Sequence, residues 1–238
     1  MIINISGYKF VSLDFLAKLK TELLDFCKSK DIKGTILLAK EGINIMLAAD
    51  NEAIQAFETF IKAKPVFADI AFKYSQSEQL PFEKMLIKIK KEIVTMGQPD
   101  INPAQHPAPN LPPKEFKQWL DEGRELVIID TRNDYEYELG TFEGAIDLHI
   151  KNFRSFPAAV ANLDDTMKDK PVVVFCTGGI RCEKAAPYMI KQGFKEVYQL
   201  EGGILKYFEE CDGAHYKGEC FVFDDRILVN TKLEEVNR

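Results

Sequence analysis

One cysteine in the chain is followed by a short run of residues suited to holding an anion. The run reads Cys176-Thr177-Gly178-Gly179-Ile180-Arg181 and comes directly after an apolar stretch. Its two glycines permit a tight or left-handed turn that points backbone N–H groups inward. The N-terminus of a following helix and the Arg181 guanidinium add positive charge. We therefore predict that Cys176 has a lowered pKa and is the catalytic nucleophile. A persulfide on Cys176 would likewise be an anion that this loop can hold, and the residues alone leave open which anion the loop serves.

Cys176 also has a simpler interpretation, and a second cysteine, Cys182, has two possible roles. A cysteine at a strand end is often only a small buried residue, but the glycines and the arginine at this spacing favour an active thiol at Cys176. Cys182 lies on the first turn of the expected helix. It could resolve a persulfide on Cys176 by forming a disulfide, although packing against the sheet is the simpler expectation.

The elements around this loop predict a parallel sheet. Helical segments near 134–139, 155–163, 182–192 and 204–210 alternate with apolar runs at 126–130, 145–150, 171–176 and 197–200. Strands buried on both faces, with helices between them, are typical of a doubly wound parallel α/β domain. Ligands bind beyond the carboxyl ends of such strands, and Cys176 lies at such an end.

The N-terminal part predicts a different architecture. Apolar runs at 1–11, 35–39, 43–48 and 82–95 are separated by two amphipathic helical segments. Ser12 or Asp14 is expected to cap the first helix, and Asp50 or Asn51 the second. The order β-α-β-β-α-β is that of a ferredoxin-like, acylphosphatase-like α+β sandwich.

A segment crowded with proline divides the two parts. Proline lacks a backbone N–H and restrains its neighbour, so residues 97–113 are predicted to be a semi-rigid extended linker. The expected organisation is therefore an N-terminal domain at 1–96, the linker, an α/β domain at 114–216 and a C-terminal tail at 217–238.

Composition restricts the class of protein. Five cysteines without regular spacing indicate reduced thiols and no disulfide framework. No signal peptide and no apolar stretch long enough to span a bilayer is found, so we expect a cytoplasmic protein with no membrane partner. The net charge of −6 is an argument against a nucleic-acid partner, but the charge is unevenly spread. Residues 1–96 nevertheless hold 14 Lys against 12 Asp and Glu, while the rest of the chain carries −8.

Three motifs in order resemble the rhodanese family. Residues 127–145 look like the entry motif of rhodanese domains, the Cys176 loop like their catalytic loop, and 200–204 like their closing glycine motif. The resemblance implies that Asp130 and Arg132 form a structural ion pair below the loop. Phosphatases of related fold have one residue more in this loop, so its length favours a terminal sulfur over a phosphate.

A second resemblance extends over most of the chain. Residues 38–44, 177–185 and 218–226 are similar to signatures of the bacterial tRNA uridine hydroxylases. This implies an oxidoreductase that performs oxygen-dependent 5-hydroxylation of the wobble uridine, U34, in tRNA and requires the rhodanese cysteine. The implied partners are the tRNA anticodon loop and a sulfur donor, with molecular oxygen as co-substrate. No cofactor-binding motif is recognisable.

Two other functions are open. A general rhodanese-type sulfurtransferase would pass persulfide sulfur to a small acceptor or carrier protein. A non-catalytic interaction module with a rhodanese fold is the third interpretation, and the intact Cys176 and Arg181 disfavour it. No metal site is expected, because Cys211, His215 and Cys220 fit no closed four-ligand pattern.

Candidate tRNA contacts lie in the more basic N-terminal part. They are Lys40, Asn44, Lys84, Lys88, Lys90 and Lys91. Lysines supply phosphate contacts, and a base in an unpaired loop can be splayed toward a pocket. Two simpler interpretations remain open. In the first, the turn at 40–44 only closes a hairpin. In the second, the stretch 84–91 is a half-buried strand with lysines on its solvent face.

Overall fold

The computed structural model describes residues 1–236 and divides the chain into two compact units. The first unit contains residues 1–93 together with 223–226, and of the described residues the second contains 94–222 and 227–236. Positions 237 and 238 of the predicted tail lie outside the described residues. Within residues 1–236, no helix is both long enough and apolar enough to cross a membrane.

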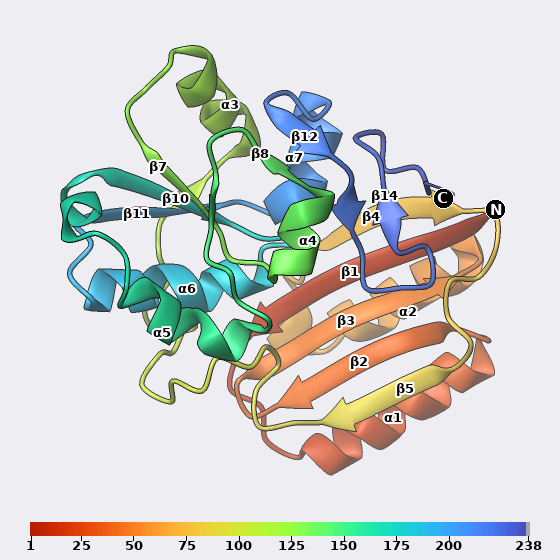
Figure 1. Cartoon of the computed structure of the whole chain (residues 1–238). Coiled ribbons are helices and arrows are strands. Elements are labelled where there is room, and N and C mark those ends of the chain that lie inside the picture. The colour runs from red at the N-terminus through yellow and green to blue at the C-terminus, as the bar shows by residue number, and fades with distance from the viewer. Residues whose placement is uncertain (237–238) are drawn as a thin grey trace. The chain divides into compact units, whose positions relative to one another are not determined.

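The first unit is an α+β sandwich, which confirms the predicted class. Its sheet has the order β4-β1-β3-β2-β5, and α1 and α2 cover one face (Figure 1). The elements are β1 (Ile2–Phe10), α1 (Leu16–Ser29), β2 (Lys33–Ala39), β3 (Gly42–Ala49), α2 (Asn51–Lys62), the 3-10 turn η1 (Pro65–Phe67), β4 (Phe72–Ser77) and β5 (Met85–Ile89). Alternate residues of β2 and β3, such as Ile36 and Ile45, enter the core between sheet and helices.

Two details of the first unit differ from the prediction. The fourth strand is β4, whereas the run 82–95 contributes a fifth strand, β5, parallel to β2. β4 is a largely polar edge strand, so it lacks the apolar alternation by which strands are found in a sequence. Neither Ser12 nor Asp14 caps α1, because Phe15 occupies the N-cap position. Asp50 does cap α2, accepting the Ala53 N–H at 2.8 Å.

The second unit is the predicted parallel α/β domain. Its main sheet has the order β6-β11-β10-β7-β9, with every neighbouring pair parallel. The elements are β6 (Asn110–Leu111), α3 (Pro113–Asp121), β7 (Val127–Asp130), α4 (Asp134–Leu139), β8 (Gly140–Phe142), β9 (Ile146–Asp147), η2 (Phe153–Ser155), α5 (Phe156–Val160), η3 (Asp165–Asp169), β10 (Pro171–Phe175), α6 (Ile180–Lys191), β11 (Glu196–Leu200), α7 (Gly203–Cys211), β12 (Tyr216–Gly218), β13 (Cys220–Phe221) and β14 (Leu228–Val229).

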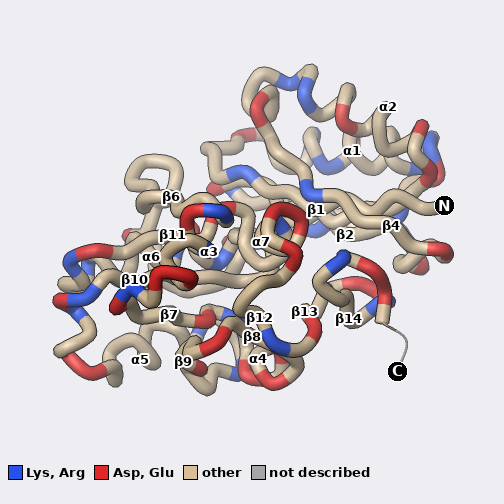
Figure 2. Tube along the Cα trace, turned by 90° about the horizontal axis from the view of Figure 1, so that it is seen from above, with Lys and Arg blue, Asp and Glu red and all other residues tan. Residues whose placement is uncertain are grey.

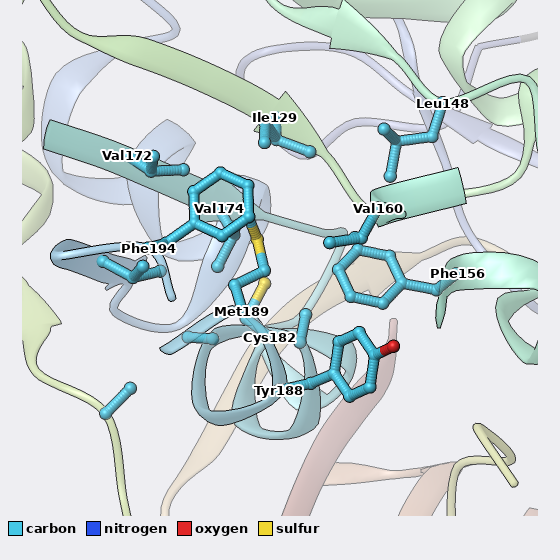
Figure 3. Packing of buried hydrophobic residues seen from close by; sticks show 14 of the residues in the cluster. Ile129, Leu148, Phe156, Val160, Val172, Val174, Cys182, Tyr188, Met189 and Phe194 are labelled. Atoms are coloured by element: carbon cyan, nitrogen blue, oxygen red, sulfur yellow. The ribbon is translucent and has the colours of Figure 1, made fainter. Parts of the chain in front are cut away.

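Two hydrophobic clusters hold this sheet between its helices. On one face, Val172 and Val174 of β10 pack with side chains of α5 and α6 (Figure 3). On the other face, Val173 and Phe175 of the same strand pack with side chains of α3 and α7. Burial on both faces explains why β10 reads as a continuous apolar run.

The proline-rich segment is part of the second unit, although the sequence predicts a linker there. Asn110 and Leu111 form the edge strand β6 beside β11. The carbonyls of Pro109 and Leu111 accept the N–H groups of Gln199 and Glu201 at 2.9 and 3.0 Å. Proline is compatible with an edge strand because its carbonyl can still accept a ladder hydrogen bond.

The C-terminal segment also contributes to the packed units. β12 pairs with β8, and β13 pairs with β14. Between the last two strands, residues 223–226 join the first unit, where Arg226 is 8% exposed. Its guanidinium donates to Asp224 at 2.6 and 2.8 Å and to the Ser75 hydroxyl at 2.7 Å.

Replacing Arg226 with alanine should therefore destabilise the protein by about 3 kcal/mol, because the Asp224 carboxylate, whose side chain is 10% exposed, would lose its partner. Urea unfolding measures this loss. Lys232→Ala, an exposed lysine of the same C-terminal segment, is the matched control and should leave the midpoint unchanged. Equal midpoints for the two variants would contradict the assigned role of Arg226.

Candidate active site

The Cys176 loop is a tight connection between β10 and α6. β10 ends at Phe175 and α6 begins at Ile180. Gly179 has a φ of 96°, a left-handed conformation that favours glycine. Its N–H donates to Cys176 Sγ at 3.1 Å. A Cβ at Gly178 would meet no protein atom within 4 Å, so the protein's own packing does not require a glycine there.

The N-terminus of α7 fixes the opposite side of the loop. The N–H groups of Ile204 and Leu205 donate to the carbonyls of Cys176 and Thr177 at 3.0 and 3.1 Å. A Cβ on Gly203 would lie 2.4 Å from the Cys176 carbonyl oxygen, so only glycine fits there. Because these carbonyls are bonded to α7, the loop N–H groups remain available on the side of the thiol.

The surroundings of Cys176 favour its thiolate. The side chain is 1% exposed, and burial alone would raise its pKa. A hydrogen bond from Cys182, the charge of Arg181 and the backbone N–H groups of both residues outweigh this effect and lower the pKa of Cys176 to about 5. These are the stabilising groups that a reactive cysteine requires.

Glu136 is a member of the site that the sequence interpretation did not single out. Its carboxylate accepts two hydrogen bonds from Arg181, at 2.7 and 2.8 Å, and both side chains are buried. It also accepts the Asn133 N–H at 3.1 Å and the Thr177 hydroxyl at 3.4 Å. Burial opposes the negative charge, but Arg181 outweighs it and the pKa of Glu136 is lowered. Its place on the first turn of α4, within the motif at 127–145, is the signal that could have identified it.

A second ion pair lies at the end of β7. Arg132 donates to Asp130 through Nε at 2.9 Å and through a terminal nitrogen at 2.6 Å, and both side chains are buried. The same guanidinium donates to the Gly140 carbonyl, and Thr141 donates to Asp130 at 3.0 Å. The pair thus joins β7 to β8, while Thr131 joins β7 to the Phe175 carbonyl through its hydroxyl at 2.9 Å.

Cys182 packs in the core beneath the loop. It is fully buried, close to Val174 and Met189 (Figure 3). Its Sγ lies 3.8 Å from the Thr131 hydroxyl oxygen. Burial and the neighbouring Cys176 raise the pKa of Cys182 well above its usual range, so its thiol keeps a proton to donate.

The C-terminal segment reaches the same loop. The Thr177 hydroxyl lies 3.4 Å from the Phe221 carbonyl oxygen as well as from Glu136, so the two acceptors share its single proton. Cys220 is buried, which raises its pKa to about 12. His215 is paired with Asp121 at 2.7 Å. Among residues 1–236, no three His, Cys, Asp or Glu side chains are grouped so that they could hold a metal ion.

The structure places some of the predicted tRNA contacts together at one end of the first unit's sheet and the others elsewhere. Lys40 is exposed on the turn between β2 and β3, and Lys90 and Lys91 are exposed just beyond β5. The parallel pairing of Leu38 with Ile89 brings these lysines to one end of the sheet. Lys88 is exposed on β5 itself near that end.

Two of the predicted tRNA contacts, Lys84 and Asn44, are not exposed at this end of the sheet. Lys84 precedes β5 at the opposite end of the sheet, roughly 20 Å from Lys90 at about 3.3 Å per residue. Asn44 is half-buried in β3, and its side-chain amide donates to the Ile93 carbonyl at 3.4 Å.

The depressed pKa of Cys176 predicts how its reactivity depends on pH. The thiolate predominates above pH 5 and is protonated below it, so alkylation by iodoacetamide should fall as the pH drops through about 5. Replacing Cys182 with alanine removes one donor and should move this midpoint upward. Mass spectrometry of the Cys176 peptide at each pH measures the rate. A midpoint near 8.5, the value of an ordinary cysteine, would contradict the arrangement.

Comparisons with known proteins identify both units. Residues 2–93 match the UPF0176 acylphosphatase like domain, and residues 112–210 match the Rhodanese-like domain. Among solved structures, a rhodanese-like domain from Anabaena sp. aligns with 46% of this chain. The alignment covers 79% of the Anabaena chain, with 23% sequence identity and a TM-score of 0.39.

Relatives with a common name match almost the whole chain. The tRNA uridine(34) hydroxylase of Cupriavidus taiwanensis is 53% identical over 238 residues, covering 98% of this chain and 84% of that protein. The protein of the same name from Ralstonia nicotianae is 51% identical, with coverages of 98% and 84%. That of Bordetella parapertussis is 49% identical, with coverages of 98% and 97%. The chain therefore belongs to the tRNA uridine(34) hydroxylase family, with a UPF0176 acylphosphatase-like domain followed by a rhodanese-like domain.

Proposed function

We propose that this protein hydroxylates C5 of uridine 34 in tRNA, with molecular oxygen as co-substrate and Cys176 as the catalytic residue. The relatives that share about half of its sequence over nearly its whole length are named for this activity. The observation that carries the proposal at residue level is the buried Cys176 side chain, whose thiolate is favoured by N–H groups, Cys182 and Arg181.

The loop also suits a persulfide on Cys176. The thiolate would attack the outer sulfur of a donor such as thiosulfate, forming an S–S bond and releasing sulfite. The terminal sulfur then carries the negative charge that began on Cys176. Loop N–H groups hold such an anion without any proton transfer, because they are already oriented by the bonds from α7 to the loop carbonyls.

We assign tRNA contact to the first unit, at the end of the sheet where Lys40, Lys90 and Lys91 lie. Their exposed ammonium groups fit phosphates of the anticodon loop. The wobble base belongs to a single-stranded loop, so its presentation to Cys176 needs no duplex melting. Lys84, at the other end of the sheet, fits this assignment less well than the remaining lysines.

The Cys176→Ser variant should lose hydroxylation by about a thousandfold or more, the scale expected when a nucleophile is removed. Purified protein is incubated in air with tRNA that carries uridine 34 and with a thiol as two-electron reductant, because one atom of O2 enters the base and the other is reduced to water. The 5-hydroxyuridine formed is measured by nucleoside mass spectrometry. Cys211→Ser, which changes a cysteine at the end of α7, should retain activity.

Full activity of Cys176→Ser would remove Cys176 from the mechanism. A wild-type protein that transfers sulfur from thiosulfate to cyanide, yet never hydroxylates tRNA, would instead establish the sulfurtransferase alternative. Mass spectrometry of the intact protein after treatment with thiosulfate tests the persulfide separately, through one added sulfur that a reductant removes.

Neutralising the lysines at one end of the sheet tests the RNA assignment. The triple variant Lys40→Gln, Lys90→Gln, Lys91→Gln should weaken tRNA binding and reduce the slope of log K against log salt by roughly 2, at about 0.7 per lost contact with single-stranded RNA. Lys84→Gln is the matched control, with little change expected. An unchanged slope in the triple variant would show that phosphates bind elsewhere.

A further inference from the structure

Phe15 is unusual in two independent ways. The residue is 84% exposed, although phenylalanine normally contributes to a core. Its backbone adopts φ 55° and ψ 39°, the left-handed conformation that bulky residues rarely take. Unusual backbone conformations persist where the surrounding structure fixes them, and they concentrate at functional sites.

The neighbours of Phe15 explain why its ring is directed outward. Leu13 is buried in the core of the first unit, and Leu16 packs against the same core. The Leu13 N–H donates to the Lys40 carbonyl at 2.9 Å, which ties this loop to the turn between β2 and β3. The Phe15 carbonyl then accepts the Leu19 N–H at 3.1 Å as α1 begins. The chain is therefore anchored on both sides of Phe15, and the ring between the anchors is held in solvent.

Stability of the fold gives no reason for this ring. Asparagine tolerates the left-handed conformation better than phenylalanine and would leave no apolar surface in water. Two other exposed aromatic residues of the described chain, Tyr74 and Tyr135, have partners. Tyr74 donates to Glu58 at 2.7 Å, and the Tyr135 ring packs edge-on against a neighbouring ring with centroids 5.3 Å apart.

The charges near Phe15 indicate what kind of partner it fits. Lys40 lies at the same end of the sheet as Phe15, together with Lys90 and Lys91. Acidic residues are interspersed there, as they are along the whole chain (Figure 2). Phosphate contacts alone give salt-sensitive binding, and a contact that does not depend on charge would strengthen it. Stacking of a base on an aromatic ring supplies such a contact.

Resting on the proposed function, we infer that Phe15 is an RNA-binding residue whose ring stacks on an unpaired base of the tRNA anticodon loop, beside phosphates held by Lys40. The exposed ring offers a flat apolar surface, and the two leucine anchors keep it in place before RNA arrives. Pre-organisation of this kind reduces the entropy lost on binding. The contact is with a base face, so it selects single-stranded loops over duplexes without selecting a base sequence.

Variants of Phe15 in the full-length protein test this. The probe is an RNA hairpin with the sequence of an anticodon stem and loop that carries uridine at the wobble position. Phe15→Asn and Phe15→Leu should each weaken binding on the order of tenfold, and Phe15→Trp should retain it. The salt slope should stay unchanged in all three, whereas Lys40→Gln should reduce it by about 0.7. The unfolding midpoint of Phe15→Asn should equal or exceed that of the wild type, which separates loss of binding from loss of folding.

Tyr74→Asn, which removes an aromatic ring of the same unit, is the control and should bind the hairpin as the wild type does. Wild-type affinity in both Phe15→Asn and Phe15→Leu would overturn the inference. A wild-type protein that hydroxylates tRNA while Phe15→Asn matches its activity and affinity would leave the proposed function intact and remove only the role of Phe15. A wild-type protein that neither binds nor hydroxylates uridine-34 RNA would overturn the proposed function itself.

Discussion

The buried ion pair between Glu136 and Arg181 is the constraint on which the site depends. Neither charge could remain in the interior alone, and breaking such a pair costs about 3–5 kcal/mol. Glu136 stands on α4 and Arg181 on α6, and Thr177 of the loop between β10 and α6 bonds to the same carboxylate. One side chain therefore joins α4 to the start of α6. The single proton of the Thr177 hydroxyl is shared between Glu136 and the Phe221 carbonyl, each 3.4 Å away, so the loop is held by one weak bond to either side.

This pairing changes how the loop holds an anion. Arg181 does lower the pKa of Cys176, but much of its charge is already balanced by Glu136. The thiolate therefore depends heavily on dipoles, namely the Gly179 N–H, the first N–H groups of α6 and the Cys182 thiol. Such a site suits a singly charged sulfur. A phosphate dianion would bring a second negative charge close to Glu136 and is disfavoured on electrostatic grounds, independently of loop length.

The sequence reveals the parts of this site that are local. Cys176, the glycines and Arg181 follow one another, and the continuous apolar run of β10 places them at a strand end. The features that the sequence does not reveal depend on contacts between residues far apart in the chain. Glu136 meets Arg181 across 45 residues, and the direction of a guanidinium cannot be deduced from its position in a motif. The same limit applies to β4, an edge strand without apolar alternation, and to Phe15, which occupies the N-cap position of α1 between Leu13 and Leu16, two residues packed with the core.

Burial of Cys176 has two consequences for the site. It strengthens the interactions that stabilise the thiolate, and it restricts access to the sulfur. With the thiolate removed from water, each donor acts at low effective dielectric and counts for more than it would at the surface. The same burial means that a substrate can approach only from the side of the loop that the protein leaves open. A Cβ on Gly178 would meet no protein atom within 4 Å, so packing does not account for that glycine, whereas Gly203, pressed against the Cys176 carbonyl oxygen, is required by the protein itself.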